Sequence, residues 1–304
     1  MNLRGIGYLG FSVPDVEAWT AFATGVVGLM PIDARNAASD AADGAVRFKA
    51  DEREWRVAVH QGERPGIAYV GFEVLDEPAF RQAVAHLEAE GAAPKSATDE
   101  ELAERGVREM VHLQDPSGTR LEVFWGPLVN AGFVSPVGVP RFVTANGFGH
   151  YVSLVSDLDA SMDFYLRVLG MKLTDYVEIG PGRSVHFLRC TPRHHTVALT
   201  AVGPIDGLHH VAFEMADIDQ VGLALERATL AGVPITATLG RHKNDHMLSF
   251  YMRSPAGFEV EVGCDARLVD DATWVVNRFG DGDLWGHHGL TGNAMAESVT
   301  ERNS

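Results

Sequence analysis

The sequence contains little cysteine and no cluster of positive charge. Only Cys190 and Cys264 occur among its 304 residues. Two thiols are too few for a disulfide framework or a thiolate metal cluster, so a cytoplasmic protein is expected. Lys and Arg number 25 against 41 Asp and Glu, which gives a formal net charge of −16. Because no basic stretch offsets this charge, nucleic acids and anionic membrane surfaces are not expected as partners.

Long apolar runs are also missing. No segment reaches the roughly 18 consecutive apolar residues that a membrane span needs. Residues 1–5 lead directly into an alternating strand pattern rather than into a signal sequence. The hydrophobic share of 46% is that of an ordinary globular chain, so we expect a folded protein without membrane spans.

What the sequence does contain is an internal repeat that divides it into two halves. Its length alone suggests about two domains. Three pairs of segments align: GIGY at 5–8 with GFGH at 147–150, AYVGFE at 68–73 with HHVAFE at 209–214, and PSGTRLE at 116–122 with PAGFEVE at 255–261. The two halves are therefore expected to share one structural plan.

The repeat singles out three side chains of the second half. His150, His210 and Glu261 stand where the first half has tyrosine, tyrosine and glutamate. Two imidazoles and one carboxylate are the ligands of a facial metal triad that leaves coordination positions open. We therefore expect a metal site in the second half, while the first half lacks the histidines to build one.

Neighbouring residues of the same type leave a choice at two of these positions. His210, and not His209, aligns with His150, so His209 is expected to pack beside the site. Glu259 and Glu261 point to the same face of a regular strand because they are two residues apart. The repeat selects Glu261 as the ligand.

Each half divides again into two similar modules. Residues 150–159 resemble residues 210–219, and their alternation predicts a strand followed by a helix that begins after Asp157 or Asp217. Strand-rich segments follow each predicted helix. The sequence therefore predicts an α+β fold of four βαβββ modules, paired into two curved sheets.

The boundary between the halves is marked by three prolines with glycines between them in residues 127–146. Periodicity fades after about residue 276, and residues 289–304 are predicted to be polar and weakly ordered. The expected units are a first domain at 1–135, a second domain at 136–275 and a partly disordered C-terminal extension at 276–304.

Five stretches of the second half resemble one enzyme family. They are GHYV at 149–152, RHHT at 193–196, HHV at 209–211, LGRHKNDHMLSFY at 239–251 and SPAGFEVEVG at 254–263. These stretches are similar to the catalytic domain of type I extradiol ring-cleaving dioxygenases of the vicinal oxygen chelate superfamily, most of all to the 2,3-dihydroxybiphenyl 1,2-dioxygenase group. The first half resembles the metal-free N-terminal domain of that group. The resemblance implies two barrel-like domains.

The resemblance also implies a cofactor and a proton carrier. It implies that His150, His210 and Glu261 bind Fe(II), with O2 as the co-substrate. Mn(II) accepts the same ligands, so the ligand set does not choose between the two metals. His195, and not His194, matches the acid–base histidine of the family, which would move a proton to and from the reacting oxygens.

A second group of residues matches the family's substrate site. His242 and Tyr251 would donate hydrogen bonds to a bound catecholate and take part in catalysis. Asn244 would orient the loop or contact oxygen. Asp245 would lie against the substrate and position His195 or close the pocket.

The implied reaction is extradiol cleavage of a 3-substituted or bicyclic catechol such as 2,3-dihydroxybiphenyl, giving a 2-hydroxymuconic semialdehyde-type acid in aromatic degradation. Relatives commonly form octamers, so a homo-oligomer is implied as well. The alternative is a glyoxalase-like, metal-dependent isomerase of the same superfamily, which would not need His195, His242 and Tyr251 together. A metal-free binding protein of the superfamily would have lost the ligand triad.

Overall fold

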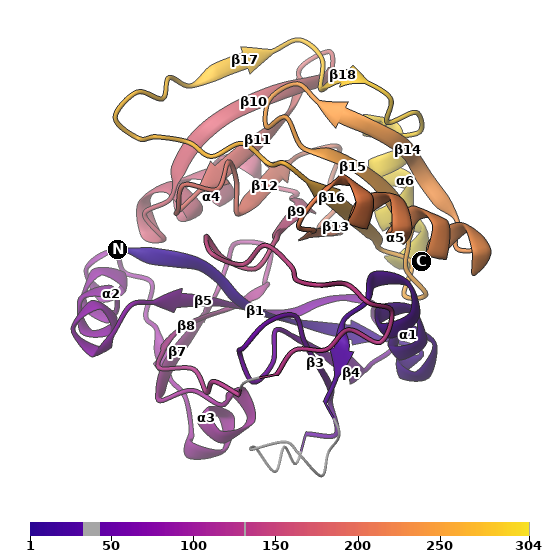
Figure 1. The fold of residues 1–304 in the computed structure, drawn as a ribbon. Coiled ribbons are helices and arrows are strands. Elements are labelled where there is room, and N and C mark those ends of the chain that lie inside the picture. The colour runs from indigo at the N-terminus through magenta and orange to yellow at the C-terminus, as the bar shows by residue number, and fades with distance from the viewer. Residues whose placement is uncertain (33–42, 131, 304) are drawn as a thin grey trace.

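The computed structural model describes residues 1–32, 43–130 and 132–303. Within these ranges the chain forms two curved sheets, one from each half, which lie one above the other in Figure 1. None of the helices in the described ranges is both long enough and apolar enough to cross a membrane.

The first half builds an eight-stranded sheet in the order β2-β3-β4-β1-β5-β8-β7-β6. Its elements in chain order are β1 (Leu3–Val13), α1 (Val16–Phe22), the π-helical turn η1 (Ala23–Val27), β2 (Met30–Pro31), β3 (Val46–Lys49), β4 (Val57–Gln61), β5 (Gly66–Val74), α2 (Glu77–Ala89), β6 (Lys95–Ser96), α3 (Asp99–Arg105), β7 (Glu109–Gln114) and β8 (Arg120–Trp125).

The second half builds a ten-stranded sheet in the order β17-β10-β11-β12-β9-β13-β16-β15-β14-β18. Its elements are β9 (His150–Leu154), α4 (Leu158–Asp163), the π-helical turn η2 (Phe164–Val168), β10 (Lys172–Gly180), β11 (Arg183–Arg189), β12 (Val197–Thr200), β13 (Gly207–Glu214), α5 (Ile218–Leu230), β14 (Ile235–His242), β15 (Leu248–Arg253), β16 (Glu259–Cys264), β17 (Asn277–Phe279), β18 (Asp283–Trp285) and α6 (Gly292–Asn303).

The four predicted βαβββ modules are confirmed by this order of elements. In each half the first strands of the two modules pair antiparallel, β1 with β5 and β9 with β13. Each also pairs in parallel with the last strand of a module: β1 with β4, β5 with β8, β9 with β12 and β13 with β16. The two halves therefore share one topology, to which the second half adds β17, β18 and α6.

The predicted helix starts of the second half are also confirmed. The Asp157 carboxylate accepts a hydrogen bond from the Ala160 amide at 3.0 Å, and Asp217 accepts one from the Gln220 amide at 3.0 Å. Such an N-cap satisfies an amide that has no partner within the helix and contributes about 1 kcal/mol. These caps fix where each strand passes into its helix.

One hydrophobic core joins the two halves. It contains buried side chains from both sheets and from α1, α2, η2 and α5. Phe11 of the first half packs against Phe258 of the second, with ring centroids 5.2 Å apart. Arg227 of α5 donates from Nε to the Val26 carbonyl at 2.9 Å. The halves are thus held together by apolar packing as well as by polar contacts.

The concave face of the first sheet is filled by its own side chains. A separate hydrophobic cluster there includes Tyr8 and Tyr69, the residues that align with the two predicted histidine ligands. Glu122 is fully buried, and it accepts hydrogen bonds from Tyr8 Oη at 2.6 Å and from Arg105 Nε at 3.0 Å. The Arg105 guanidinium lies 3.7 Å from the centre of the Tyr69 ring. Arg120 Nε also donates to Glu122 Oε1 at 2.7 Å, so two guanidinium groups balance the carboxylate that corresponds to Glu261.

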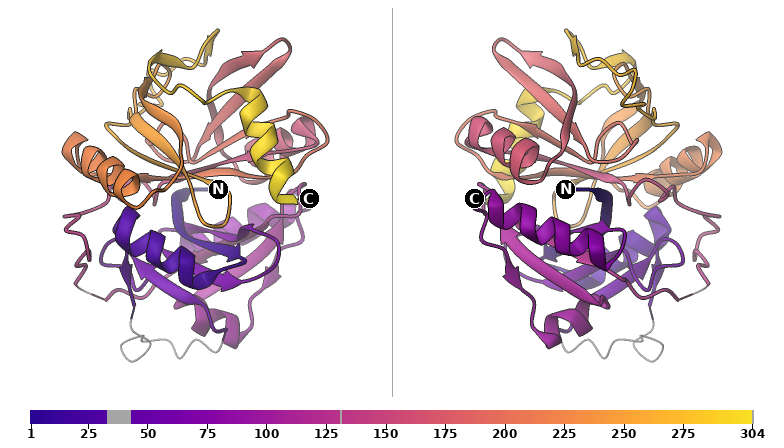
Figure 2. Two further views of the ribbon diagram at one scale, coloured as in Figure 1. Left: turned by 90° about the vertical axis from the view of Figure 1, so that its right-hand side faces the viewer. Right: turned by 90° about the vertical axis from the view of Figure 1, so that its left-hand side faces the viewer.

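The C-terminal extension belongs to the second sheet. β17 pairs with β10 and β18 pairs with β14. Residues 289–304 were predicted to be weakly ordered, whereas the structure places α6 over Gly292–Asn303, and Ser304 lies outside the described residues. The physical reason is that Met295 and Val299 are buried in a cluster with strands of the sheet. Figure 2 shows α6, in yellow, alongside the second sheet.

We expect Arg105→Leu to lower the free energy of unfolding by about 2 kcal/mol or more, because it removes the more buried of the two guanidinium groups that bind the Glu122 carboxylate and leaves only Arg120. Urea denaturation followed by circular dichroism measures this change. Leucine in place of the exposed Arg64 is the matched control and should change it by less than about 0.5 kcal/mol. Adding Glu122→Gln to Arg105→Leu should recover part of the loss, and no recovery would contradict the explanation.

Candidate metal centre and active site

The strand register brings the predicted metal ligands together. His150 on β9 lies opposite Ala212 on β13, and Ala212 lies opposite Glu261 on β16. Residues opposite one another in neighbouring strands point to the same face of a sheet. His210 precedes Ala212 by two residues and therefore shares that face.

A glycine sets the approach of β9 to β13. Gly149 has a positive φ of 65°, and a Cβ atom added to it would lie 2.0 Å from the Ala212 carbonyl oxygen. Only glycine combines this backbone conformation with so close an approach. The position of His150, the next residue, therefore depends on Gly149.

The three ligand atoms are close and buried. His150 Nε2 lies 3.0 Å from Glu261 Oε2, and His210 Nε2 lies 3.5 Å from the same oxygen. The residues are exposed by 5% or less. His210 Nδ1 contacts His209 Nδ1 at 2.7 Å, so His209 packs beside the site as predicted. Glu261 Oε1 is buried, and His242 Nε2 lies 3.5 Å from it.

The electrostatics of the triad fit a divalent metal ion. Burial lowers the pKa of His150, although Glu261 opposes that shift. Burial raises the pKa of Glu261, but hydrogen bonds from His150, His210 and His242 outweigh it and hold that pKa well below its ordinary value. A neutral imidazole and an ionised carboxylate are the forms that bind metals. Both oxygens of Glu261 face these histidines, so the carboxylate lies where such an ion would be bound.

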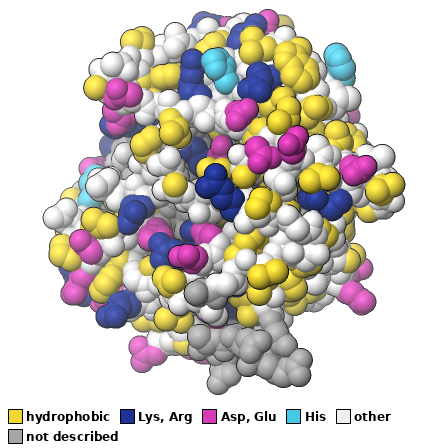
Figure 3. All heavy atoms as spheres, viewed as in Figure 1, with side chains coloured by type: hydrophobic (Ala, Val, Ile, Leu, Met, Phe, Trp, Pro, Cys, Tyr) yellow, Lys and Arg dark blue, Asp and Glu magenta, His cyan; other side chains and the backbone are white. Residues whose placement is uncertain are grey.

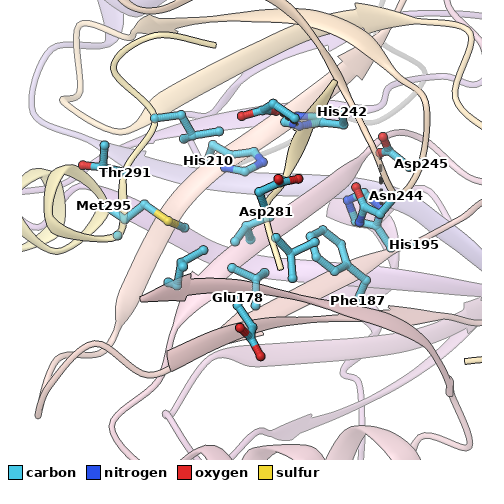
Figure 4. Close-up of a pocket in the computed structure, with 18 of the residues that line it drawn as sticks. Glu178, Phe187, His195, His210, His242, Asn244, Asp245, Asp281, Thr291 and Met295 are labelled. Carbon is cyan, nitrogen blue, oxygen red and sulfur yellow. Dashed lines mark hydrogen bonds and ion pairs between the residues drawn. The ribbon is translucent and has the colours of Figure 1, made fainter. Parts of the chain in front are cut away.

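The triad lies at one end of a cavity of about 400 Å³. All eight predicted site residues line this cavity, namely His150, His195, His210, His242, Asn244, Asp245, Tyr251 and Glu261. The remaining walls are mostly apolar, with side chains of Val152, Val177, Ile179, Val185, Phe187, Leu290 and Met295, and they also include Glu178, Asp281, Asp283 and Thr291. Figure 4 shows the polar side chains of His195, Asn244 and Asp245 grouped on one side and Met295 reaching in from the opposite side.

His195 is next to the triad and has a free nitrogen. Its ring centroid lies 3.9 Å from that of His150. Burial, together with the neighbouring His150 and His194 rings, lowers the pKa of His195 well below its ordinary value, so the imidazole is neutral. Its Nε2 atom is buried without a hydrogen-bond partner among the described residues. A neutral imidazole with a free nitrogen can exchange a proton with a bound molecule.

His242 and Tyr251 form a hydrogen-bonded pair on the other side of the triad. His242 Nε2 lies 2.9 Å from Tyr251 Oη, and His242 Nδ1 lies 2.8 Å from an oxygen of Asp283. Burial lowers the pKa of His242, but the hydrogen bonds to Asp283 and Glu261 outweigh it and raise it to about 10. A charged His242 can donate hydrogen bonds to an anionic oxygen.

Asn244 and Asp245 lie beside His195. Asn244 Nδ2 donates to Asp175 Oδ1 at 3.3 Å, and Asp245 Oδ1 accepts from the Met247 amide at 2.9 Å. The other carboxylate oxygen of Asp245 lies 3.8 Å from His195 Nδ1. Both residues thus line the cavity near His195.

Sequence reasoning missed the part of this site that the C-terminal extension supplies. Asp283 contacts His242, and the buried His287 lies 2.7 Å from Asp283 through its Nδ1 atom. Leu290 and Met295 line the apolar end of the cavity. The extension has no counterpart in the first half, so the internal repeat could not identify these residues. The spacing of Asp283 and His287 was the one local signal available.

Comparison with known proteins agrees with this geometry. The family model described as Glyoxalase/Bleomycin resistance protein/Dioxygenase superfamily matches residues 147–262. The model described as Dihydroxybiphenyl dioxygenase BphC D1 matches residues 6–62. Each half of the chain therefore contains a match of its own.

Full-length relatives extend these matches. Biphenyl-2,3-diol 1,2-dioxygenase of Paraburkholderia xenovorans strain LB400 is 38% identical over 305 residues, which cover 98% of this chain and 99% of that protein. An iron-dependent extradiol dioxygenase of Rhodococcus jostii strain RHA1 is 36% identical, covering 94% and 97%. The crystal structure of BphC, a halotolerant catechol dioxygenase, has a TM-score of 0.88 at 36% identity and covers 95% of both chains. The chain belongs to the type I extradiol dioxygenases of the glyoxalase/bleomycin resistance protein/dioxygenase superfamily.

Proposed function

We propose that this protein is an Fe(II)-dependent extradiol dioxygenase that cleaves a 3-substituted or bicyclic catechol such as biphenyl-2,3-diol. The observation that carries the proposal is the buried group of His150, His210 and Glu261 in a cavity whose other walls are mostly apolar. The relative from Paraburkholderia xenovorans is named for this diol, and the relative from Rhodococcus jostii is named as iron-dependent. Ring cleavage of such a diol uses O2 as the co-substrate.

The metal would be held by the three side chains of the triad. When bound there, Fe(II) supplies a redox-active centre with open coordination positions. Mn(II) accepts the same donors, and the iron-dependent relative favours iron. Apart from the metal, the protein contributes by orienting the diol, excluding water and moving protons.

The residues around the triad take separate parts in this proposal. His195 Nε2 accepts a proton from a substrate hydroxyl and later returns one to the product. His242 and Tyr251 donate hydrogen bonds to the oxygens of the bound catecholate. Asn244 and Asp245 line the wall beside His195 and hold the substrate edge against it.

The apolar end of the cavity supports the choice of a substituted catechol. Val177, Ile179, Val185 and Met295 surround space beyond the polar groups, where no hydroxyl of the substrate needs a partner. A volume of about 400 Å³ lies within the usual range for small-molecule pockets. A second apolar ring attached to the catechol would fill this space and would itself be removed from water.

Oxygen uptake by protein that has been purified anaerobically and loaded with Fe(II) tests the function. We expect uptake and a yellow product with biphenyl-2,3-diol, 1,2-dihydroxynaphthalene and 3-methylcatechol, and weaker activity with catechol. The absence of oxygen uptake with all four diols would contradict the proposal. Metal analysis of the same sample reports whether the protein retained iron.

We also propose that the protein is cytoplasmic and forms a homo-oligomer, with an octamer as the expected assembly. Large apolar side chains on its surface support association, among them Leu230, which is 83% exposed, and Val275, which is 71% exposed. On the face shown in Figure 3, acidic and basic side chains are interspersed without a continuous basic area. Light scattering after size-exclusion chromatography should give a mass above that of the 32.9 kDa monomer, and a monomeric mass would contradict the assembly.

We expect His210→Ala to lose both metal and turnover, because the triad then keeps only two ligands. His195→Ala should retain metal and lose about 10²–10⁴-fold in kcat, because the ion does not depend on this side chain but proton transfer does. Metal analysis and oxygen uptake of both variants separate these effects. His288→Ala removes an exposed histidine as the control. Wild-type turnover by His195→Ala would exclude its part in proton transfer.

We expect Met295→Trp to lower kcat/KM for biphenyl-2,3-diol by about tenfold or more, because the larger side chain occupies the apolar end of the cavity. The value for unsubstituted catechol should change by less than about threefold, since its single ring stays near the triad. Met295→Leu keeps the side-chain volume and serves as the control. Equal losses for the two substrates would contradict the assignment of this end to the substituent.

A further inference from the structure

A chain of three buried side chains leads from the interior to His195. Asp175 Oδ2 lies 2.9 Å from His194 Nε2, and His194 Nδ1 lies 3.2 Å from His195 Nδ1. All three residues are less than 5% exposed. At the end of the chain, His195 Nε2 faces the cavity and has no hydrogen-bond partner among the described residues. The function proposed above gives His195 a role in proton transfer but gives no role to Asp175 or His194.

The order of donors and acceptors in this chain follows from the carboxylate. Both oxygens of Asp175 face donors, because Oδ1 also accepts from Asn244 Nδ2 at 3.3 Å. An ionised carboxylate can only accept, so His194 Nε2 carries a hydrogen. A neutral imidazole has one N–H group, which leaves His194 Nδ1 as an acceptor. His195 Nδ1 must then donate, and its Nε2 carries a lone pair.

A second acceptor favours the same arrangement. Asp245 Oδ2 lies 3.8 Å from His195 Nδ1. This negative charge stabilises a hydrogen on Nδ1 and does nothing for one on Nε2. Two independent groups on the Nδ1 side therefore direct the lone pair of His195 into the cavity.

The pair behind His195 is fixed in place. Thr174 Oγ1 donates to the His194 carbonyl at 2.7 Å, and Trp274 Nε1 donates to the Thr174 carbonyl at 2.7 Å. The Trp274 ring also packs edge-on against the His194 ring, with centroids 5.9 Å apart. Apolar residues of the same volume often replace a buried polar pair without loss of stability. Stability alone therefore does not account for an Asp–His pair that ends on His195.

We infer that Asp175 and His194 are positioning residues that hold His195 as the tautomer with its hydrogen on Nδ1, so that Nε2 meets the substrate as a proton acceptor. The inference rests on the proposed function, in which His195 Nε2 takes a proton from a substrate hydroxyl. That proton adds to the Nε2 lone pair, and the hydrogen on Nδ1 stays in place. The resulting imidazolium is stabilised by Asp245 and, through His194, by Asp175.

Two nearly isosteric variants of His194 separate this role from a structural one. The Oδ1 atom of asparagine can accept from His195 Nδ1, as His194 Nδ1 does, whereas leucine cannot. We expect His194→Leu to lose about tenfold or more in kcat while KM changes by less than about threefold. His194→Asn should recover a large part of kcat. Asp175→Asn should also lower kcat, because an amide whose oxygen still accepts from Asn244 Nδ2 turns its NH2 group toward His194 Nε2, which must then accept and no longer carries a hydrogen.

The tautomer itself can be measured without turnover. In metal-free protein labelled with ¹⁵N-histidine, the His195 nitrogens are assigned by their loss in His195→Gln. We expect a hydrogen on Nδ1 in the wild type and in His194→Asn, and a mixture of tautomers in His194→Leu. A hydrogen on Nε2 in the wild type would overturn the inference, and so would an unchanged tautomer and kcat in His194→Leu. If His194→Leu fails to fold, as judged by circular dichroism, the same outcomes are read from Asp175→Asn.

These results distinguish the inference from the proposed function. Suppose that the wild type consumes no oxygen with any catechol, but that His195 carries its hydrogen on Nδ1 only while His194 is present. The proposed function is then wrong, while the inference that His194 sets the tautomer of His195 is supported. If the wild type cleaves catechols and both His194 variants match it in kcat and tautomer, the function stands and the inference fails.

Discussion

The second half depends on the register between three neighbouring strands, β9, β13 and β16. This register places His150, Ala212 and Glu261 side by side across the sheet, with His210 two residues along the middle strand. A shift of one residue in either pairing would turn a ligand to the opposite face. Gly149 allows β9 to approach β13 closely enough for this alignment. The metal centre is therefore a consequence of strand pairing as much as of ligand identity.

The first half has the same topology as the second half but lacks the two histidines. Its concave face contains Tyr8 and Tyr69 where the second has ligands, yet it keeps the glutamate as Glu122. A buried carboxylate needs a positive partner, and the guanidinium groups of Arg105 and Arg120 supply it. The charge of the buried glutamate is thus balanced in a different way in each half. A side-chain cation fills the first cavity, while the second leaves space for an ion and a substrate.

The cavity of the second half has a polar end and an apolar end, and different parts of the chain form them. Repeated strands supply the polar end, where titratable side chains gather around Glu261. The extension supplies Met295 to the apolar end and Asp283 to the back of His242. The apolar end of the cavity and the orientation of His242 therefore both depend on the C-terminal extension, which packs as part of the second sheet rather than as a loose tail.

The sequence by itself determined the duplicated plan, the helix starts at Asp157 and Asp217, and the choice of Glu261 over Glu259, because these features repeat or follow local rules of capping and alternation. It could not reveal that Asp283 lies behind His242, or that Asp175 and His194 form a chain that ends at His195. Such contacts join strands that are distant in sequence, and no periodicity records which residues will be opposite each other. Only the tertiary structure decides them, because register and sheet curvature arise from the packing of the whole chain.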